Sequence, residues 1–352
     1  MNFKKILAIL VASFMLLAVS ACGEKVEPNN TTDTERQTKE ITETETEEEI
    51  PEEPNGAPIR IVSTIFPQYD WVRKIIGEKA ENFDLTLLIN STVDLHSYQP
   101  SISDVAVISD CDLFIYVGGH SDKWVKGVLE NNENAVNEEL IVINLVEELG
   151  EDVLWTDHVC EDEECEDDHG EEGFEEDEHV WMSLRAAQLF CEVISEAIIA
   201  LDPNNEEVYI ENTEDYIARL SALDEKYTES IEAADKDILV FADRFPFLYL
   251  TTDYGLEHFA AFSGCSAESE ASISTIVILS RKLDQLELEF IMVTETADNS
   301  IAETIIENTQ AKNHKILVLN GFQAITSKDV EDGVTYLSVM ESNLEILKEA
   351  LA

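Results

Sequence analysis

The sequence predicts an α/β protein with two similar lobes, each built on a parallel sheet, joined by one long rigid helix. Short apolar segments alternate with amphipathic helical segments in both halves of the chain. The apolar segments show no polar face, which is typical of parallel strands covered on both sides. Between the halves, Asn205 to Ala234 contains neither Gly nor Pro and has the apolar spacing of a helix.

Residues 1–22 have the features of an export signal. Basic residues in Asn2 to Lys5 precede an apolar run, Ile6 to Val19, that is shorter than the roughly 20 residues of a membrane span. The segment Val19 to Cys22 resembles the lipobox of bacterial lipoproteins. That resemblance implies lipidation of Cys22 and a folded part that lies outside the cytoplasm, anchored to the bacterial cell membrane. An ordinary signal peptide or a membrane anchor is the alternative.

Residues 23–58 are rich in Glu, Thr, Pro and Asn and nearly free of apolar side chains, which predicts a disordered acidic tether. The whole chain has 22 basic and 75 acidic residues, for a net charge of −53. Such a charge argues against nucleic acid as a partner, because phosphate would be repelled, and it favours cations.

Residues 59–202 form the predicted first lobe. The expected strands are residues 59–64, 85–89, 113–117 and 140–144, and the expected helices are residues 68–76, 101–109, 123–131 and 184–201. Ligands of a parallel sheet lie outside the carboxyl ends of its strands. This rule draws attention to Asp94 and His96 after the second strand, and to Gly118 to His120 after the third.

Residues 203–234 are the predicted linking helix, and residues 235–352 are the predicted second lobe. The same alternation returns there, in residues 238–241, 254–262, 272–286, 290–294, 301–308, 316–319 and a final helix near residues 334–350.

An acidic loop is predicted at residues 151–178 of the first lobe. It carries sixteen carboxylates, and residues 155–182 contain no Lys or Arg. Mutual repulsion should keep it a solvated loop unless a cation neutralises it. The segment also holds His158 and His169, so it is either a disordered insertion or a loop that gathers a divalent metal.

Five cysteines follow Cys22, an odd number that excludes a complete disulfide framework. Cys111 and Cys191 lie in apolar periodic segments and are expected to be buried. Cys160 and Cys165, in the acidic loop, could form a bridge, bind metal or do neither.

Several motifs then occur in a recognisable order: TIFPQYDWVRKI, DLHSYQPSISDV, FIYVGGHSDKWV, DEHVWMS, DRFPF with DYGLEHFAAFSGCSAESEAS, and VTETADNSIAETI. With them the chain resembles the zinc/manganese solute-binding lipoproteins of ABC importers, the cluster A-I family, from Ile59 to Ala352. The resemblance implies one metal ion in the cleft between the lobes and no catalysis. A zinc hydrolase is also disfavoured because the chain lacks an HExxH helix, a nucleophile elbow and a phosphate loop.

The resemblance places the first two metal ligands on His96 and His179, and imidazole is a ligand that zinc prefers. A further ligand, an acidic residue of the second lobe, falls on Glu295. The other interpretation of Glu295 is a carboxylate in solvent or in a salt bridge.

The third ligand position departs from the family. Family members have His or Glu where this chain has Ala242. The adjacent Asp243 is a candidate ligand, or else forms an ion pair with the next residue. His120 is a further candidate, whereas His258 and His314 are expected to be surface or packing residues.

The function implied by the resemblance is a receptor that binds Zn²⁺ tightly and delivers it to an ABC permease with its ATPase. Residues His158 and His169 would capture zinc transiently in the acidic loop, where zinc-specific members carry a His-rich insertion. The protein is expected to be a monomer. A receptor for Mn²⁺ on the same fold and a surface adhesin for cell adhesion are the alternatives.

Overall fold

The structure is a computed structural model that describes residues 57–352, apart from residues 91–92, 94, 132–136, 138, 158–173 and 263–270. The fold below is that of the unit Glu53–Ala352. The predicted signal and tether therefore lie outside the described residues, apart from Ala57 and Pro58. So do several residues singled out by the sequence: Cys22, Asp94, His158, Cys160, Cys165, His169 and Cys265.

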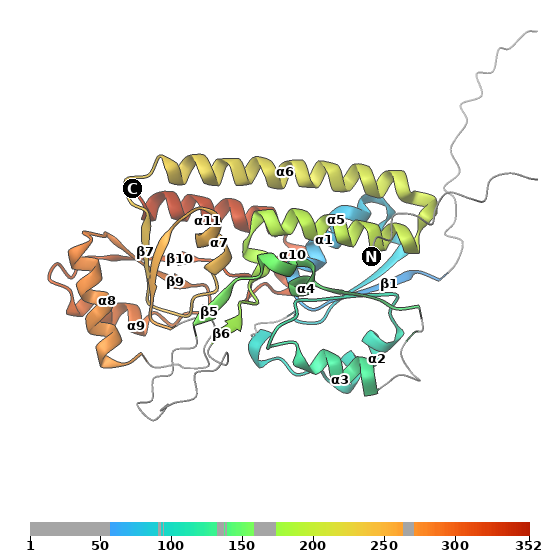
Figure 1. The fold of residues 1–352 in the computed structure, drawn as a ribbon, viewed down its shortest axis with the longest axis horizontal. Helices are drawn as coiled ribbons and strands as arrows, with labels where there is room; N and C mark the ends of the chain where they lie inside the picture. Colours follow the sequence, from blue (N-terminus) through green and yellow to red (C-terminus); the bar gives the residue numbers. More distant parts are fainter. Residues whose placement is uncertain are drawn as a thin grey trace, which may run out of the picture. The chain divides into compact units, whose positions relative to one another are not determined.

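The first lobe contains a parallel four-stranded sheet in the order β2-β1-β3-β4. Its strands are β1 (Ile59–Ser63), β2 (Phe83–Leu87), β3 (Leu113–Tyr116) and β4 (Ile141–Asn144). Helices cover both faces (Figure 1). These helices are α1 (Phe66–Ile76), α2 (Ile102–Asp110), α3 (Lys123–Asn131), α4 (Leu145–Leu149) and α5 (Leu184–Leu201).

The second lobe repeats this topology, with a parallel sheet in the order β10-β9-β7-β8. In both lobes the first strand lies between the second and the third, so both have a topological switch point where ligands commonly bind. The strands are β7 (Ile238–Phe241), β8 (Glu257–Ala260), β9 (Phe290–Thr294) and β10 (Lys315–Leu319). The helices are α7 (Leu248–Asp253), α8 (Ile273–Gln285), α9 (Ser300–Asn308), α10 (Ser327–Glu331) and α11 (Tyr336–Ala350).

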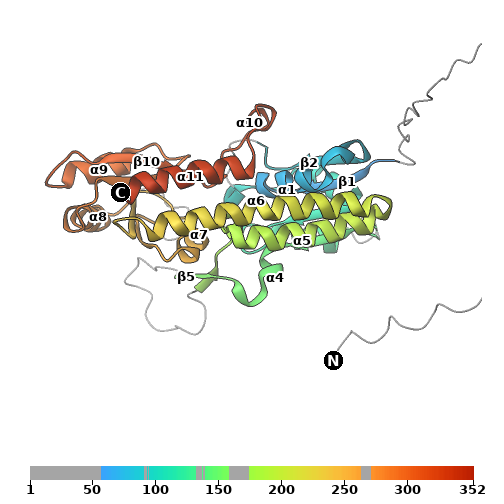
Figure 2. The same ribbon diagram turned by 90° about the horizontal axis from the view of Figure 1, so that it is seen from above.

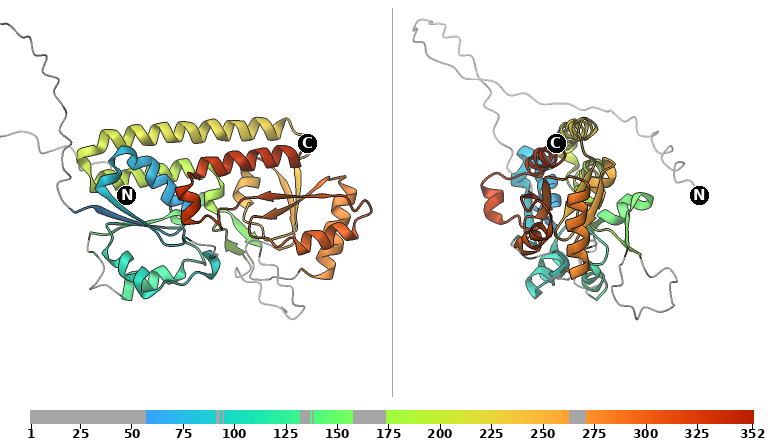
Figure 3. Two further views of the ribbon diagram at one scale, coloured as in Figure 1. Left: turned by 180° about the vertical axis from the view of Figure 1, so that it is seen from behind. Right: turned by 90° about the vertical axis from the view of Figure 1, so that its left-hand side faces the viewer.

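The long helix α6 (Glu206–Glu232) follows α5 and leads into the second lobe. It packs along α5, α1 and α11, as the view from above in Figure 2 shows, and the view from behind in Figure 3 shows it beside α11. Its buried side chains recur every three or four residues, as an amphipathic helix requires. They are Tyr209, Thr213, Tyr216, Leu220, Leu223 and Tyr227.

One hydrophobic core connects the two lobes. Its largest cluster extends from Ile61 in β1 through Tyr227 in α6 to Leu347 in α11. Separate clusters fill the outer face of each sheet, one beneath α2 and α3 and one beneath α8 and α9. The predicted fold class, two parallel-sheet lobes with a long joining helix, is confirmed. The predicted burial of Cys111 and Cys191 as free thiols is also confirmed.

The acidic stretch, residues 151–178, was expected to be a solvated loop unless a cation neutralised it, yet both of its ends are ordered. Strands β5 (Trp155–Asp157) and β6 (Phe174–Glu176) pair antiparallel. Beyond β6, Asp177 and Glu178 are buried. Backbone pairing and hydrogen bonds to backbone N–H groups satisfy polar groups that charge repulsion alone would leave in water.

Among the helices that the structure describes, none is both long enough and apolar enough to cross a membrane.

Candidate metal centre

His96 lies in a short 3-10 helix, Leu95–Ser97, in the connection between β2 and α2. Its neighbour Leu95 is buried and fixes this turn against the core. The His96 Nδ1 atom lies 2.7 Å from the Ser121 hydroxyl and 3.7 Å from Glu178 Oε2. Both partners are on the Nδ1 side of the ring, so Nε2 is directed toward the candidate site.

His179 lies directly before the short 3-10 helix Val180–Met182, and its side chain is 3% exposed. Asp177 Oδ1 receives its backbone N–H at 2.9 Å and lies 3.0 Å from its Nδ1. A carboxylate at this distance favours the tautomer with a proton on Nδ1, which leaves the Nε2 lone pair for a metal.

The structure brings the two predicted histidine ligands together. The Nε2 atoms of His96 and His179 are 3.3 Å apart, with the rings tilted by 51°. In the described part of the chain, however, no three His, Cys, Asp or Glu side chains come close enough to hold a metal ion together. The structure therefore contains a two-histidine pair, and the roles of Glu295, Asp243 and His120 as ligands stay predictions.

Buried carboxylates surround this pair. Asp122 accepts hydrogen bonds from the backbone N–H groups of Val117 and Gly118 at 2.9 and 3.1 Å. Burial raises the pKa of the Asp122 carboxyl to about 6, and the nearby Glu178 adds to this rise. Negative charge next to two imidazoles favours a bound cation.

Apolar side chains form one wall beside the pair. The Trp181 ring packs edge-on against His179, with ring centroids 5.2 Å apart. A small pocket here is lined by residues of both lobes: Ile65, Phe66, Ile89, Val93, Leu95, Trp181, Phe322, Gln323 and Ile325. An apolar lining excludes water and strengthens electrostatic interactions with a bound ion.

Glu295 directly follows β9, at the carboxyl end of the second sheet. Its two carboxylate oxygens accept the backbone N–H groups of Gly321 and Gln323 at 2.8 and 2.7 Å. The Gly321 carbonyl in turn accepts a hydrogen bond from Trp181 Nε1 at 3.0 Å. Glu295 is therefore linked through one residue to the segment that carries His179.

Asp243 and His120 have other partners. Asp243 Oδ2 accepts the backbone N–H of Thr294 at 3.1 Å as well as its hydroxyl, and Oδ1 accepts the backbone N–H of Arg244 at 2.8 Å. These bonds hold the loop after β7 to the end of β9. His120 is exposed, and its Nδ1 lies 2.9 Å from the Lys123 ammonium, which would repel a metal cation.

The remaining described histidines have packing roles, as expected. The His258 ring stacks on Phe245 with centroids 3.8 Å apart, and burial lowers the pKa of His258. His314 Nδ1 lies 2.8 Å from the Leu288 carbonyl oxygen.

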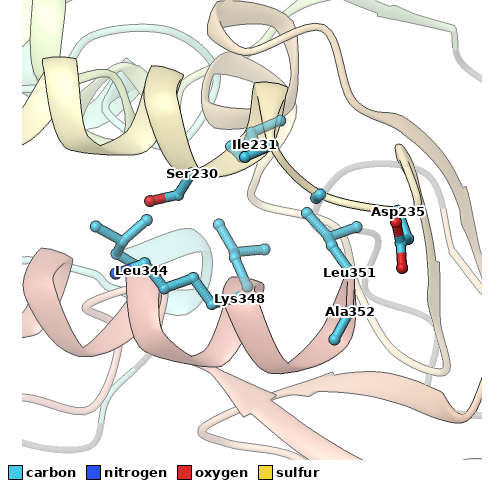
Figure 4. Close-up of a pocket in the computed structure, with 10 residues that line it drawn as sticks. Ser230, Ile231, Asp235, Leu344, Lys348, Leu351 and Ala352 are labelled. Atoms are coloured by element: carbon cyan, nitrogen blue, oxygen red, sulfur yellow. The ribbon is translucent and has the colours of Figure 1, made fainter.

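A larger cavity, of about 280 Å³, lies between the C-terminal ends of α6 and α11 (Figure 4). Its lining is mostly aliphatic and includes neither His nor Cys. It therefore lacks the donors that a zinc site requires.

The family model for the zinc-uptake complex component A, periplasmic, matches residues 61–350. The chain belongs to this family. It is a family of solute-binding transport proteins and not an enzyme family.

Two curated relatives show how far the similarity extends along the chain. The zinc-binding lipoprotein AdcA of Streptococcus pneumoniae is 32% identical over 293 residues, which are 83% of this chain and 55% of that protein. This chain therefore spans about half the length of that relative. The high-affinity zinc uptake system protein ZnuA of Bacillus subtilis is 30% identical over 353 residues, 99% of this chain and 98% of that protein.

Solved structures agree with the family assignment. The zinc-bound ZnuA-like domain of Streptococcus pneumoniae AdcA matches with a TM-score of 0.65 and 28% identity, over 84% of this chain and 99% of that one. The periplasmic zinc-binding protein TroA of Treponema pallidum matches with a TM-score of 0.66 at 22% identity, which supports the fold alone.

The sequence did not indicate three residues that contact the two histidines: Asp177, Glu178 and Ser121. All three stand within motifs that the sequence did show, DEHVWMS and VGGHSD. A carboxylate two residues before a ligand histidine is a local signal that could have indicated Asp177. Nothing local signals that Ser121 contacts His96, because 25 residues separate them.

Proposed function

We propose that this chain is the extracytoplasmic zinc receptor of an ABC importer, which binds Zn²⁺ and delivers it to a membrane permease. The observation that carries the proposal is the approach of the two Nε2 atoms of His96 and His179 to 3.3 Å. Zinc–nitrogen bonds of about 2.0–2.1 Å at a tetrahedral angle place two ligand nitrogens about 3.3 Å apart. The two imidazoles therefore have the spacing of a zinc chelate.

The second lobe would supply the next ligand through Glu295. Its carboxylate is held by two backbone N–H groups, and each oxygen retains a lone pair for an ion. Asp243 is the second candidate from this lobe. Its bonds to Thr294 make it more suited to holding the loop than to binding metal.

Zinc is favoured over manganese by the donor set. Two imidazoles suit Zn²⁺, whereas Mn²⁺ prefers carboxylate, carbonyl and water oxygens. The relatives are also named for zinc: one is a zinc-binding lipoprotein and another belongs to a zinc uptake system. A titration of one protein sample with both ions in competition tests this preference.

The cellular setting follows from the same family. A component of a zinc-uptake complex requires a permease and an ATPase as partners. Lipidation of Cys22 would anchor a monomeric receptor to the membrane, with the acidic tether between anchor and lobes. Metabolic labelling with a fatty acid, compared between wild type and Cys22→Ala, tests the anchor. A screen of metal-loaded and metal-free protein against matrix proteins tests adhesion.

The decisive experiment measures Zn²⁺ affinity by competition with a chromophoric chelator. His96→Ala and His179→Ala should each abolish tight binding, since a lone imidazole cannot chelate. His120→Ala is the matched control, an exposed histidine outside the pair, and should bind zinc as the wild type does. Equal affinity in the His96/His179 double variant would refute the proposed site.

A further inference from the structure

Glu178 is a carboxylate that is buried instead of exposed to water. It directly precedes His179, yet the residue is only 5% exposed. Its side chain crosses to the loop after β3, where Oε1 accepts the backbone N–H of Ser121 at 2.7 Å. Burying a carboxylate costs free energy unless the group is paired or hydrogen-bonded.

Gly119 makes room for this side chain. A Cβ atom added at Gly119 would lie 2.6 Å from Glu178 Cγ, and the φ angle of Gly119 is +71°, a conformation that favours glycine. Any other residue at this position would displace the carboxylate. The β3–α3 loop is therefore shaped around Glu178.

From this position the second carboxylate oxygen faces the other ligand. Glu178 Oε2 is buried, lacks a hydrogen-bond partner and lies 3.7 Å from His96 Nδ1. This distance is too long for a hydrogen bond but short enough for strong electrostatic attraction to an N–H group. The Ser121 hydroxyl lies 2.7 Å from the same nitrogen. Glu178 also holds Ser121 in place, because its Oε1 accepts the Ser121 backbone N–H.

We infer that Glu178 is a positioning residue for His96: it holds Ser121 in place and keeps the His96 proton on Nδ1, so that Nε2 meets the metal ion. This inference rests on the proposed function, in which His96 and His179 bind Zn²⁺. Two adjacent carboxylates then each orient one of the two histidines. Asp177 orients His179, and Glu178 orients His96 across the gap between two loops.

The inference can be tested with variants of the full chain. Glu178→Gln keeps the size and the acceptor for the Ser121 N–H but removes the charge, and Glu178→Ala removes both. Glu176→Gln is the matched control, because Glu176 is exposed in the adjacent strand and loses the same charge. Partners in the second coordination shell of a metal ligand typically contribute about 10- to 100-fold to affinity. We expect Zn²⁺ affinity to fall by that range in Glu178→Ala, by less in Glu178→Gln, and not in Glu176→Gln.

The readout specific to positioning is the tautomer of His96. ¹⁵N labelling of the seven histidines, with His96→Ala used for assignment, reports which ring nitrogen carries the proton in metal-free protein. Wild type should show the proton on Nδ1, and Glu178→Gln should show a shift toward Nε2. An unchanged tautomer together with wild-type affinity in both Glu178 variants would overturn the inference. If His96→Ala itself retained tight zinc binding, the proposed site would fail instead.

Discussion

Tyr249 joins the second lobe to the segment that carries His179. The residue lies in α7, and its hydroxyl donates to the Asp177 carbonyl at 3.0 Å and accepts the backbone N–H of Leu154 at 3.1 Å. Burial raises the pKa of Tyr249, so the hydroxyl remains a donor at neutral pH. Tyr249→Phe would keep the ring packing and remove both bonds.

The cost of this substitution follows from the burial of its partners. Asp177 is 3% exposed, so its carbonyl would lose its bond without gaining water, whereas Leu154 is half-buried and water can replace its bond. One unsatisfied buried group costs about 1–3 kcal/mol. For a domain of about 300 residues, this loss lowers Tm by about 2–5 °C.

Urea unfolding and calorimetry of metal-free protein measure both quantities. The matched control is Tyr98→Phe, which removes a hydroxyl bonded to the more accessible Asp104 carboxylate and should change stability by less than about 0.5 kcal/mol. Equal stability of wild type and Tyr249→Phe, or an equal loss in both variants, would show that this hydroxyl does not anchor the segment.

Three further outcomes are expected. Asp177→Ala should weaken Zn²⁺ binding by about 10- to 100-fold, because His179 loses the acceptor of its backbone N–H and its Nδ1, and Asp177→Asn, which keeps an oxygen, should recover part of it. Burial raises the pKa of the Asp70 carboxyl above 3.8, so the folded state holds its proton more tightly than the unfolded chain. Stability should therefore fall as pH rises from about 4 through the raised value, and urea unfolding should show wild type losing stability relative to Asp70→Asn over this range. Replacement of residues 159–172 by a short Gly–Ser turn should leave tight Zn²⁺ affinity unchanged and lower the total zinc bound at saturation; loss of the tight site would contradict the division between capture loop and site.

Local patterns were sufficient for most of the fold. The bounds predicted for α3, α5, β7 and β9 are those of the structure, because apolar periodicity and flanking turn residues define them without reference to the rest of the chain. The β5–β6 hairpin was missed for the opposite reason. Its strands are three residues long and lie on either side of a long acidic segment, so only tertiary contacts reveal the pairing.

The prediction from like charges was wrong directly after β6. Asp177 and Glu178 were grouped with fourteen similar carboxylates and were expected in water, yet both are buried. Their oxygens accept backbone N–H groups of His179 and Ser121, which a count of like charges cannot anticipate. The two carboxylates that best explain the site were therefore the hardest to distinguish in the sequence.

The segment after β6 belongs by sequence to the first lobe but is hydrogen-bonded to the second. Asp177 bonds to Tyr249, 72 residues away, and Trp181 bonds to Gly321 and Tyr336, 140 and 155 residues away. Motifs can predict that His179 is a ligand, but such distant partners leave no local pattern. The position of His179 relative to His96 therefore depends on how the two lobes pack. A substitution in α7 or α11 that shifts these contacts would alter the 3.3 Å spacing without touching either histidine.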